Sequence, residues 1–563
     1  MTEPRTTLFG IPTRRPAAVG RLSPALRMAL SGRIAGEDDY LTEAQRRERS
    51  LHKQQEARDR GLTPDWFTDQ RGILCLPSQG VKVAVVGGGF AGLMAGWYLL
   101  RCGVDVTVYE ARDLVNGRVH TDRKFLYPNH AEFGAELIGE NHPLWMLLSR
   151  HFELPLTPIT EYPHARLRLA GSDLTPDEQD DMESEAAALQ HALGTMAHGV
   201  SEIDPWTHHR AREWDAHSVE SAMDLPELKG VATPAAVTWL RFTLGNDNCV
   251  TTERQSFLGL LSSISAARMG SDKPGMLGYW RSTETHRCRA GNDELGTNLA
   301  GELGVRVQTA TVVTQIQIQS GSAMVTTQRS PGGEQAVSSQ PERFDYVVLT
   351  APPSAWHEIT FVPAFNPASR SLHQGAAVKF LTRYPSRFWL EPDQPPFEDK
   401  PAARWDELGS LWETTDGQPP DTPPATEQSP PVGLSVFAGG QFVQPAASYP
   451  EKVQRIFPHG DPGPPDPAPK QRFLDWPHTR YIETGYSAPA VGQVTTVCPA
   501  QLQPHEQCLY FAGEQTSSGF FGYMEGALQS GARAARDIVR RVAVPCPPTA
   551  GQGDAVTEPA PPR

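Results

Sequence analysis

A short apolar run, a glycine-rich turn and a longer apolar stretch follow one another near residue 90. The run at 81–86 (VKVAVV) is rich in β-branched residues and ends in glycines, which is typical of a buried strand. The stretch at 91–103 (AGLMAGWYLLRCG) predicts a helix, and 105–110 (DVTVYE) predicts a second strand. Strand, turn, helix and strand in this order predict one βαβ unit of a parallel sheet.

Polar or proline-rich segments flank this pattern and interrupt the rest of the chain. Residues 1–80 form a polar N-terminal extension, in which 41–61 predict a helix with few apolar positions. We expect that helix to be solvated and to pack loosely on the main body. Prolines at 418–431 and 457–470 predict surface loops, and 542–563 are expected to form a disordered tail.

Composition narrows the class of protein. A chain of 563 residues exceeds the size of one hydrophobic core, so at least two domains are expected. The net charge of −14 argues against a nucleic acid partner. The 7 cysteines lack any CxxC or metal-ligand spacing, which favours reduced thiols in the cytoplasm and no metal site. No apolar stretch is long enough for a membrane helix, and none follows Arg14-Arg15 as an export signal requires.

The glycines after the first strand have the spacing of a dinucleotide-binding turn. In GxGxxG the first glycine permits the tight turn, the second admits a pyrophosphate, and the third lets helix pack on strand. The helix start supplies amides and a partial positive charge. Glu110 ends the next strand, 18 residues after Gly92, where its carboxylate would accept hydrogen bonds from ribose hydroxyls. The predicted contacts are Gly87, Gly89, Phe90, Ala91, Gly92 and Glu110.

The residues after Glu110 favour FAD over NAD. The segment EARDLVNGRVHTDR at 110–123 resembles the part of the flavin amine oxidase family in which an acidic residue and a Gly-Gly-Arg reach the adenosine ribose and pyrophosphate. Here Asn116 and Gly117 replace the Gly-Gly, and asparagine tolerates a positive φ better than most residues. The resemblance thus assigns Ala111, Arg112, Gly117 and Arg118 to the cofactor.

The resemblance to monoamine oxidases and L-amino-acid oxidases continues in separate blocks to about residue 541. The block at 286–316 looks like the segment that returns the chain to the FAD-binding domain. The most specific block, LYFAGEQTSSGFFGYMEGALQSGARAARDIV at 509–539, implies a glutamate at the ribityl hydroxyls and a helix whose positive end faces the flavin N1 and O2 edge. The implied cofactor contacts are Val313, Trp476, Gly513, Glu514, Gly522, Tyr523 and Met524.

The same resemblance places the substrate site. Lys379, in AAVKFLTRYPSRFW, matches a lysine that in relatives holds a water against flavin N5. Tyr486 and Tyr523 match the two walls of an aromatic cage that would steer the amine nitrogen and keep the site dry. Gly485 stands where some relatives carry a cysteine joined to FAD, so we expect non-covalent binding. The catalytic assignments are therefore Lys379, Tyr486 and Tyr523.

The implied architecture is an α/β (α+β two-domain) fold. A Rossmann-like FAD-binding domain is expected from 81–145, 284–355 and 478–541, interleaved with a substrate-binding domain of mixed sheet and helices from 146–283 and 356–477. Relatives of this kind are often homodimers, so a homodimer is expected as well.

The substrate class rests on one position. Amino-acid oxidases commonly carry an arginine for the substrate carboxylate where this chain has Leu137, which favours a plain amine because a buried carboxylate without a cation is costly. Glu136 and Glu140 are candidates to recognise a second cationic group. Three arginines of the expected substrate domain could still reach the pocket: Arg241, Arg268 and Arg281.

The reaction that the resemblance implies is oxidation of the neutral amine. Hydride transfer from the α-carbon to flavin N5 would give an imine, water would hydrolyse it to a carbonyl compound and ammonia, and O2 would be reduced to H2O2. Turnover should then rise with pH as the bound amine loses its proton. The alternatives are an L-amino-acid oxidase giving a 2-oxo acid or a related monooxygenase, a dehydrogenase or desaturase with another acceptor, and a non-enzymatic FAD-stabilised scaffold.

Overall fold

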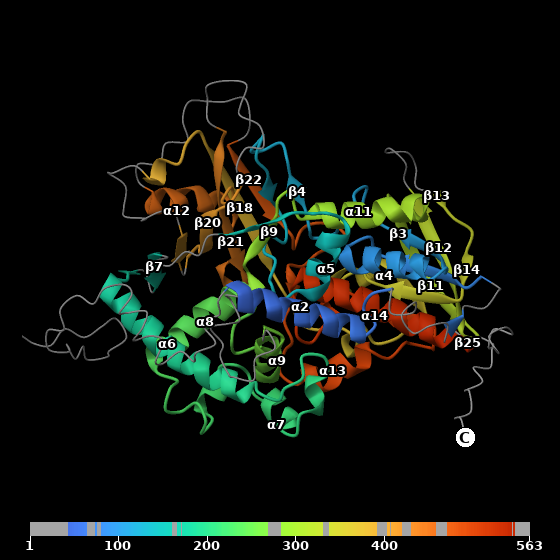
Figure 1. The fold of residues 1–563 in the computed structure, drawn as a ribbon, viewed down its shortest axis with the longest axis horizontal. Helices are drawn as coiled ribbons and strands as arrows, with labels where there is room; N and C mark the ends of the chain where they lie inside the picture. The colour runs from blue at the N-terminus through green and yellow to red at the C-terminus, as the bar shows by residue number, and fades with distance from the viewer. Residues whose placement is uncertain are drawn as a thin grey trace, which may run out of the picture.

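The chain folds around two sheets that lie side by side (Figure 1). The structure is a computed structural model, and it describes residues 43–64, 74–75, 80–159, 166–169, 172–267, 283–329, 337–390, 402–405, 407–418, 430–457, 470–542 and 544–545. Most of both proline-rich segments therefore lies outside the described residues, as do 546–563, Arg268 and Arg281.

The first sheet has five parallel strands in the order β10, β3, β2, β15, β24. Helix α4 (Phe90–Arg101) connects β2 to β3, which confirms the predicted βαβ unit. Segments far apart in the sequence thus form neighbouring strands, and the carboxyl ends of these parallel strands lie at the same edge of the sheet. The strands are β2 (Lys82–Val86), β3 (Asp105–Tyr109), β10 (Val307–Gln308), β15 (Tyr346–Leu349) and β24 (Leu509–Phe511).

Both faces of the parallel sheet are covered. Along β2, Val83 and Val85 pack with α4, α11 (Asp293–Leu303) and α14 (Met524–Val542), whereas Ala84 and Val86 pack with a second, mostly antiparallel layer of strands. The alternation follows from the two-residue period of a strand. The outer layer consists of β11 (Thr311–Gln319), β12 (Ser322–Arg329), β13 (Val337–Ser338), β14 (Glu342–Phe344) and β16 (Thr360–Val362).

The second sheet has seven strands in the order β22, β18, β21, β20, β19, β7, β8. Helices α8 (Pro234–Asp247) and α12 (Tyr449–Ile456) pack their apolar side chains on it, and α6 (Pro176–Met196) and α9 (Phe257–Ala267) form a further helical core. The strands are β7 (Arg166–Leu169), β8 (Ser172–Asp173), β18 (Ala377–Tyr384), β19 (Ala402–Trp405), β20 (Gly409–Glu413), β21 (Val432–Gly439) and β22 (Gln471–Asp475).

The two units are interleaved along the chain, as the fold class predicted from the sequence requires. The chain builds part of the first sheet, passes through β7 and β8 of the second, returns for β10 and β15, and completes the second sheet before β24. The domain boundaries given above stay predictions. Strand β16 still pairs with β11, beyond the expected boundary at residue 355.

One expectation about the N-terminal extension is wrong. Helix α2 (Glu43–Asp59) forms where the sequence predicts a helix, but it is not loosely packed, because one face is buried against the body. At the other end of the chain, strand β25 (Val544–Pro545) pairs with β1 (Leu74–Cys75) of the N-terminal extension, and the disorder expected for the rest of the tail stays a prediction because 546–563 lie outside the described residues.

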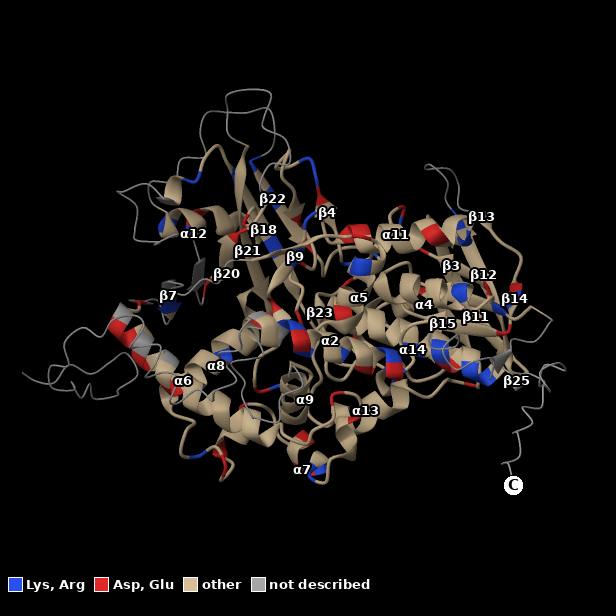
Figure 2. Cartoon of the chain, in the orientation of Figure 1, with Lys and Arg blue, Asp and Glu red and all other residues tan. Residues whose placement is uncertain are grey.

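Acidic and basic residues are interspersed over the elements of both units (Figure 2). None of the helices in the described ranges combines the length and apolar character needed to cross a bilayer. The cysteines whose side chains are described form no disulfide bond with one another: Cys102, Cys249, Cys288, Cys498 and Cys508.

Candidate active site

A cavity of about 1230 Å³ lies between the two units and is lined by both. At one end are the glycine-rich turn and the end of β3, and at the other are side chains of β18, β20 and β21. The structure brings together these residues singled out from the sequence: Gly87, Gly89, Phe90, Ala91, Glu110, Ala111, Arg112, Gly117, Arg118, Val313, Lys379, Trp476, Tyr486, Gly513, Glu514, Gly522, Tyr523 and Met524.

Gly92 lies below the cavity floor rather than in its lining, and its position explains why it is glycine. A Cβ at Gly92 would stand 1.9 Å from the carbonyl oxygen of Gly87, so only glycine lets α4 approach the turn. Gly87 has a φ of +111°, and a Cβ there would lie 2.6 Å from Thr350 Oγ1. No side chain caps α4. Its first-turn amides therefore keep their capacity to bind an anion at the cavity.

The Glu110 carboxylate is fixed at the carboxyl end of β3. It accepts hydrogen bonds from the amides of Gly88 at 2.6 Å and Arg112 at 2.8 Å. Burial raises the pKa of Glu110, while the two amide hydrogen bonds act in the opposite direction. A carboxylate held in this way beside the glycine turn fits the ribose of a dinucleotide.

The Asn116-Gly117 turn adopts the backbone that a Gly-Gly pair would give. Asn116 has a φ of +79° and Gly117 a φ of +57°. The Asn116 amide nitrogen donates to the carbonyl oxygen of Asp293 at 3.1 Å, which ties the turn to the start of α11. A Cβ on Gly296 of that helix would lie 1.8 Å from Asn116 Oδ1. Asparagine at 116 therefore depends on glycine at 296.

Glu514 connects three segments of the cavity wall. Its carboxylate accepts from Arg118 at 3.0 Å, from Ser487 Oγ at 2.6 Å and from the amide of Gly522 at 2.7 Å. Arg118 also donates to the carbonyl oxygen of Gly485 at 2.7 Å. The side chain predicted to reach the ribityl chain is thus held between the turn after β3 and the two tyrosine-bearing segments.

The far end of the cavity is aromatic. The Tyr486 ring lies parallel to Phe437, with centroids 6.4 Å apart and an interplanar angle of 9°, and its hydroxyl donates to the carbonyl oxygen of Asp247. Burial raises the pKa of Tyr486 well above its usual range, so the phenol stays neutral. Tyr523 packs edge-on against His142 at 5.5 Å. Both tyrosines line the cavity, and their face-to-face arrangement as a cage stays a prediction.

A buried charged cluster stands in the cavity wall beside the aromatic side chains. Glu136 Oε2 lies 2.5 Å from Lys379 Nζ, and Glu136 Oε1 lies 2.7 Å from a guanidinium nitrogen of Arg287. Trp412 donates its indole N–H to Glu136 at 2.8 Å. Burial opposes ionisation, but Lys379 and Arg287 outweigh it and lower the pKa of Glu136. Both carboxylate oxygens are therefore already occupied by protein donors.

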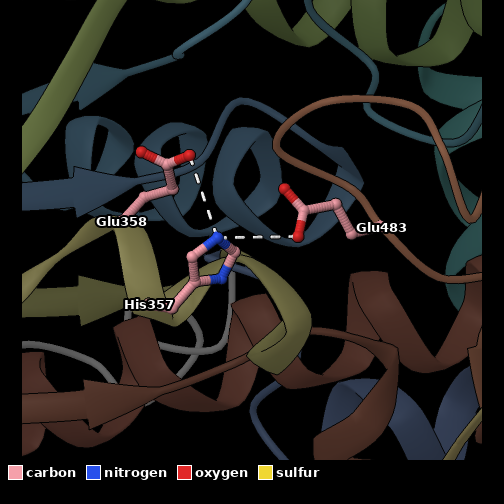
Figure 3. A group of neighbouring side chains, drawn as sticks. All are labelled: His357, Glu358 and Glu483. Atoms are coloured by element: carbon pink, nitrogen blue, oxygen red, sulfur yellow. Dashed lines mark ion pairs between the residues drawn. The ribbon is translucent and has the colours of Figure 1, made fainter.

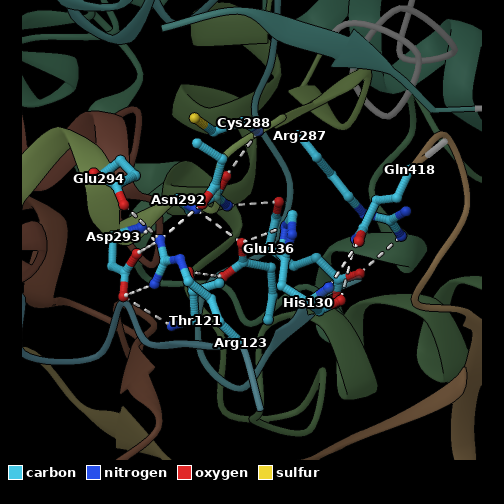
Figure 4. Close-up of polar contacts among 12 residues, drawn as sticks. Thr121, Arg123, His130, Glu136, Arg287, Cys288, Asn292, Asp293, Glu294 and Gln418 are labelled. Carbon is cyan, nitrogen blue, oxygen red and sulfur yellow. Dashed lines mark hydrogen bonds and ion pairs between the residues drawn. The ribbon is translucent and has the colours of Figure 1, made fainter. Parts of the chain in front are cut away.

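A second buried acid, Glu132, lies next to this cluster, and Figure 4 labels two of its hydrogen-bond donors, Thr121 and Asn292, together with Glu136. Lys379 also donates to the backbone carbonyl of Glu132 at 2.9 Å. The Glu132 carboxylate accepts from Thr121 Oγ1 at 2.9 Å and from the amide of Asn292 at 2.8 Å. Burial raises the pKa of Glu132 to about 8. Glu132 is consequently a titratable group next to the candidate catalytic lysine.

Sequence reasoning missed Arg287, Trp412 and Phe437 in the cavity wall and the ion pairs of Glu136. Arg287 lies in the HRCR stretch that opens the block at 286–316, but nothing local indicates that it meets a carboxylate about 150 positions earlier. Arg241, by contrast, does not line the cavity, because it forms an ion pair with Glu220 on another surface.

A group of potential metal ligands, His357, Glu358 and Glu483, lies at the surface of the described part of the chain (Figure 3). His357 Nε2 stands 3.8 Å from Glu358 and 3.7 Å from Glu483, and the His357 side chain is 60% exposed. Ion pairing in solvent accounts for this arrangement, and we assign it no metal.

Comparison with known proteins agrees with the geometry of the cavity. A family model described as flavin containing amine oxidoreductase matches residues 90–539. The chain is 23% identical to amine oxidase [flavin-containing] B of Sus scrofa, covering 82% of this chain and 86% of the relative. It is 24% identical to nicotine dehydrogenase of Pseudomonas putida, covering 81% and 88%. A solved putrescine oxidase bound to putrescine superposes with a TM-score of 0.65 at 17% identity, covering 83% and 100%.

Proposed function

The chain belongs to the family of flavin-containing amine oxidoreductases, and on that basis we propose that it is an oxidase of a plain amine that uses O2 and holds FAD non-covalently. The observation that carries the proposal is a single cavity that joins a dinucleotide-binding turn to an aromatic wall and a buried lysine. A protein that only stored FAD would not need the second half of that cavity.

The residues present fit FAD along the length of the cavity. The amides at the start of α4, together with Glu110 and Arg118, would hold the pyrophosphate and the adenosine ribose. Glu514 and the first turn of α14 would hold the ribityl chain and the pyrimidine edge of the flavin. FAD, when bound, supplies the acceptor for the hydride of the substrate and passes the electrons to O2.

The surroundings of Gly485 support non-covalent attachment of FAD. Among the described residues that line the cavity there is no cysteine. A Cβ at Gly485 would lie 2.6 Å from Ala377 Cβ and 2.7 Å from the backbone nitrogen of Ala377, so a cysteine does not fit without movement of β18. Acid denaturation should therefore release all flavin into the supernatant, whereas yellow precipitated protein would show a covalent bond.

The charges of the cavity favour a plain amine over an amino acid. The arginines among the described lining residues each have a protein partner: Arg112 donates to the carbonyl oxygen of Gly117, Arg118 pairs with Glu514, and Arg287 pairs with Glu136. Leu137 also lines the cavity, as an apolar side chain. A substrate carboxylate would have to break one of these pairs or remain uncompensated, and either event is costly. The curated relative named as an amine oxidase agrees with this preference.

The idea that Glu136 recognises a second cation on the substrate is not part of this proposal. Its two oxygens are bonded to Lys379, Arg287 and Trp412. The aromatic rings of Tyr486 and Tyr523, the two predicted walls of the cage, would instead receive the amine through their electron-rich faces and exclude water. Lys379 is assigned to the water and oxygen side of the reaction, where its ammonium group would stabilise developing negative charge. A homodimer and a cytoplasmic location stay predictions from the sequence.

The decisive experiment is anaerobic bleaching of the purified yellow protein. Primary amines, secondary amines, diamines and the twenty amino acids are mixed with the protein without oxygen, and the flavin absorbance is followed. Oxygen is then admitted and H2O2 is measured. Bleaching by amines with release of H2O2 is expected, at a rate that rises with pH. Bleaching by amino acids alone would identify the L-amino-acid oxidase, bleaching without H2O2 a dehydrogenase, and no bleaching at all would contradict an enzymatic role.

A further inference from the structure

Helix α2 lies N-terminal to the stretch that the family model matches. One face of this helix is buried, although most of its residues there are polar. Ser50, Lys53, Gln54 and Ala57 are each less than a tenth exposed and follow the i, i+3, i+4, i+7 spacing of one helix face. Buried polar groups are stable only when they find partners. The residues that bind these buried polar side chains therefore show which parts of the protein the helix supports.

Lys53 reaches the substrate-side helices. Its ammonium group donates to the carbonyl oxygen of Ala266, near the end of α9, at 2.5 Å and lies 3.4 Å from the carboxylate of Glu202. The Lys53 side chain is 7% exposed, so its charge is compensated almost entirely by these two residues.

The loop that precedes α14 packs directly on the same two residues, Ala266 and Glu202. A Cβ on Gly519 would lie 2.8 Å from Ala266 Cβ and 2.9 Å from the carbonyl oxygen of Glu202, so the loop rests directly on them. Lys53 Nζ also lies 5.9 Å from the ring centroid of Phe520, within the range of a cation–π contact. One buried ammonium group thus holds both the loop and its support.

Phe520 of this loop connects Lys53 with Tyr523, one of the two predicted walls of the aromatic cage. Phe520 packs edge-on against Tyr523 at 6.4 Å and against His142 at 5.5 Å, and His142 packs against Tyr523 at 5.5 Å. Ser50 Oγ donates to the carbonyl oxygen of Glu140 at 2.8 Å, and Glu140 lines the cavity. Helix α2 therefore touches the wall behind Tyr523 from two sides.

The C-terminal end of α2 is anchored on the FAD side. Arg536 of α14 donates to the carbonyl oxygen of Arg60 at 2.7 Å, and Tyr98 of α4 donates to the carbonyl oxygen of Gly61 at 2.8 Å. The helix consequently connects α4 and α14 with the end of α9, and in Figure 1 it crosses the centre of the molecule in blue.

We propose that α2 is a positioning element of the active site, in which Lys53 fixes the 517–523 loop and with it the Tyr523 wall of the substrate cavity. Substrate fit is then set in part by a helix outside the stretch that the family model matches. The kinetic part of this inference rests on the proposed function, whereas the structural part does not.

The structural part is tested by hydrogen exchange with mass spectrometry on the FAD-loaded full chain. Lys53→Met removes the ammonium group and keeps the length of the side chain, Lys53→Arg keeps the charge, and His52→Ala is the matched control on the exposed face of the same helix. In Lys53→Met, exchange should increase in peptides covering 517–523, because this loop loses its support, and in 139–146, because His142 packs on Phe520 of that loop, with other peptides unchanged. Lys53→Arg and His52→Ala should resemble the wild type. Unchanged exchange in Lys53→Met would overturn the proposal.

The kinetic part uses the best amine from the bleaching screen. Lys53→Met should raise KM by about tenfold while kcat and the FAD content change by less than about twofold, because the wall and not the reacting centre is displaced. A lower melting temperature with unchanged KM would show a purely structural helix. If Lys53→Met does not fold, Ser50→Ala takes its place in both measurements. If no amine reacts with the wild type, the proposed function fails, while the exchange result still decides the role of α2.

Discussion

Glu136 Oε2 lies 2.5 Å from Lys379 Nζ, and both side chains are at most 5% exposed. The second oxygen of the same carboxylate binds Arg287, so one buried anion is shared by two buried cations. Such a cluster is stable only while its members compensate one another, because each isolated charge would pay a large desolvation penalty. The lysine assigned to the oxygen side of the reaction is therefore held by a carboxylate that has no spare capacity for substrate.

Replacing Glu136 with Gln should destabilise the protein by about 3–5 kcal/mol, since it removes the carboxylate that binds the two buried cations Lys379 and Arg287. Lys379→Met should cost less, because Glu136 keeps Arg287 and the Trp412 N–H. The double variant should be more stable than the sum of the single losses predicts. Denaturant unfolding of the four proteins measures the coupling, and strictly additive losses would contradict a shared cluster.

Lys379→Met should also slow one half-reaction, the reoxidation of the flavin, and leave the other, its reduction by amine, nearly unchanged. We expect the anaerobic reduction of the flavin by amine to change little, while reoxidation by O2 slows by about tenfold or more as the ammonium group is lost. Stopped-flow absorbance records both rates on the same preparation. Loss of FAD from the variant, or slowing of reduction alone, would remove Lys379 from the oxygen side.

Asn116 and Gly296 should behave as a pair. Gly296→Ala should reduce the FAD content and the melting temperature, because its Cβ would overlap Asn116 Oδ1. Asn116→Gly, which restores the family's own Gly-Gly turn, should rescue it. Gly301→Ala is the matched control on the same helix, since a Cβ there meets nothing within 4 Å and should stabilise α11 by up to about 1 kcal/mol. FAD absorbance per protein and thermal melting test Gly296→Ala, the double variant Asn116→Gly/Gly296→Ala and Gly301→Ala, and failure of the rescue would contradict the pairing.

The sequence predicts which residues gather at the glycine-turn end of the cavity, because the signals for that end are local. The spacing of Gly87, Gly89 and Gly92 after an apolar strand dictates a turn whose steric demands are visible in the structure. Glu110 follows from the same reasoning, because a strand delivers its last side chain to a known edge of the sheet. The resemblance of 509–539 to the family placed Glu514 and Tyr523 in the cavity lining as well.

The charged cluster and the role of α2 were not predictable in this way. Glu136 and Arg287 meet only when β9 (His286–Cys288) packs beside the segment after β5 (Ala131–Glu132), and nothing in either stretch encodes that contact. The buried face of α2 is mostly polar, so hydropathy assigns it to solvent. Its burial depends on partners far away in the chain, such as Ala266, which no periodicity reveals.

Glu132 should make stability fall with rising pH. Burial raises its pKa from 4.5 to about 8, so the folded protein binds a proton that the unfolded chain has already released over this interval. The stabilising contribution is complete below pH 4.5 and is lost as the pH rises to about 8, with a slope of at most about 1.4 kcal/mol per pH unit. Glu132→Gln should flatten the curve of unfolding free energy against pH over this interval, whereas the exposed Glu342→Gln should not. An identical slope in wild type and Glu132→Gln would contradict a raised pKa.

Two variants of Tyr486 should separate the role of its aromatic ring from the role of its hydroxyl group. Tyr486 stacks on Phe437, and a Cβ on Gly522 would lie 2.8 Å from Tyr486 Cδ2, so the ring packs directly on the segment before α14. Tyr486→Phe keeps this ring and loses the hydrogen bonds of its hydroxyl group, to the carbonyl oxygen of Asp247 and with the Cys249 thiol, each worth about 1 kcal/mol. Its KM should stay within about fivefold of the wild type. Tyr486→Ala removes the wall itself, and KM for an amine should rise by about tenfold or more. Steady-state kinetics on both variants, with FAD content measured in parallel, test this difference. Equal losses in the two variants would mean that the hydroxyl group, and not the face of the ring, receives the substrate.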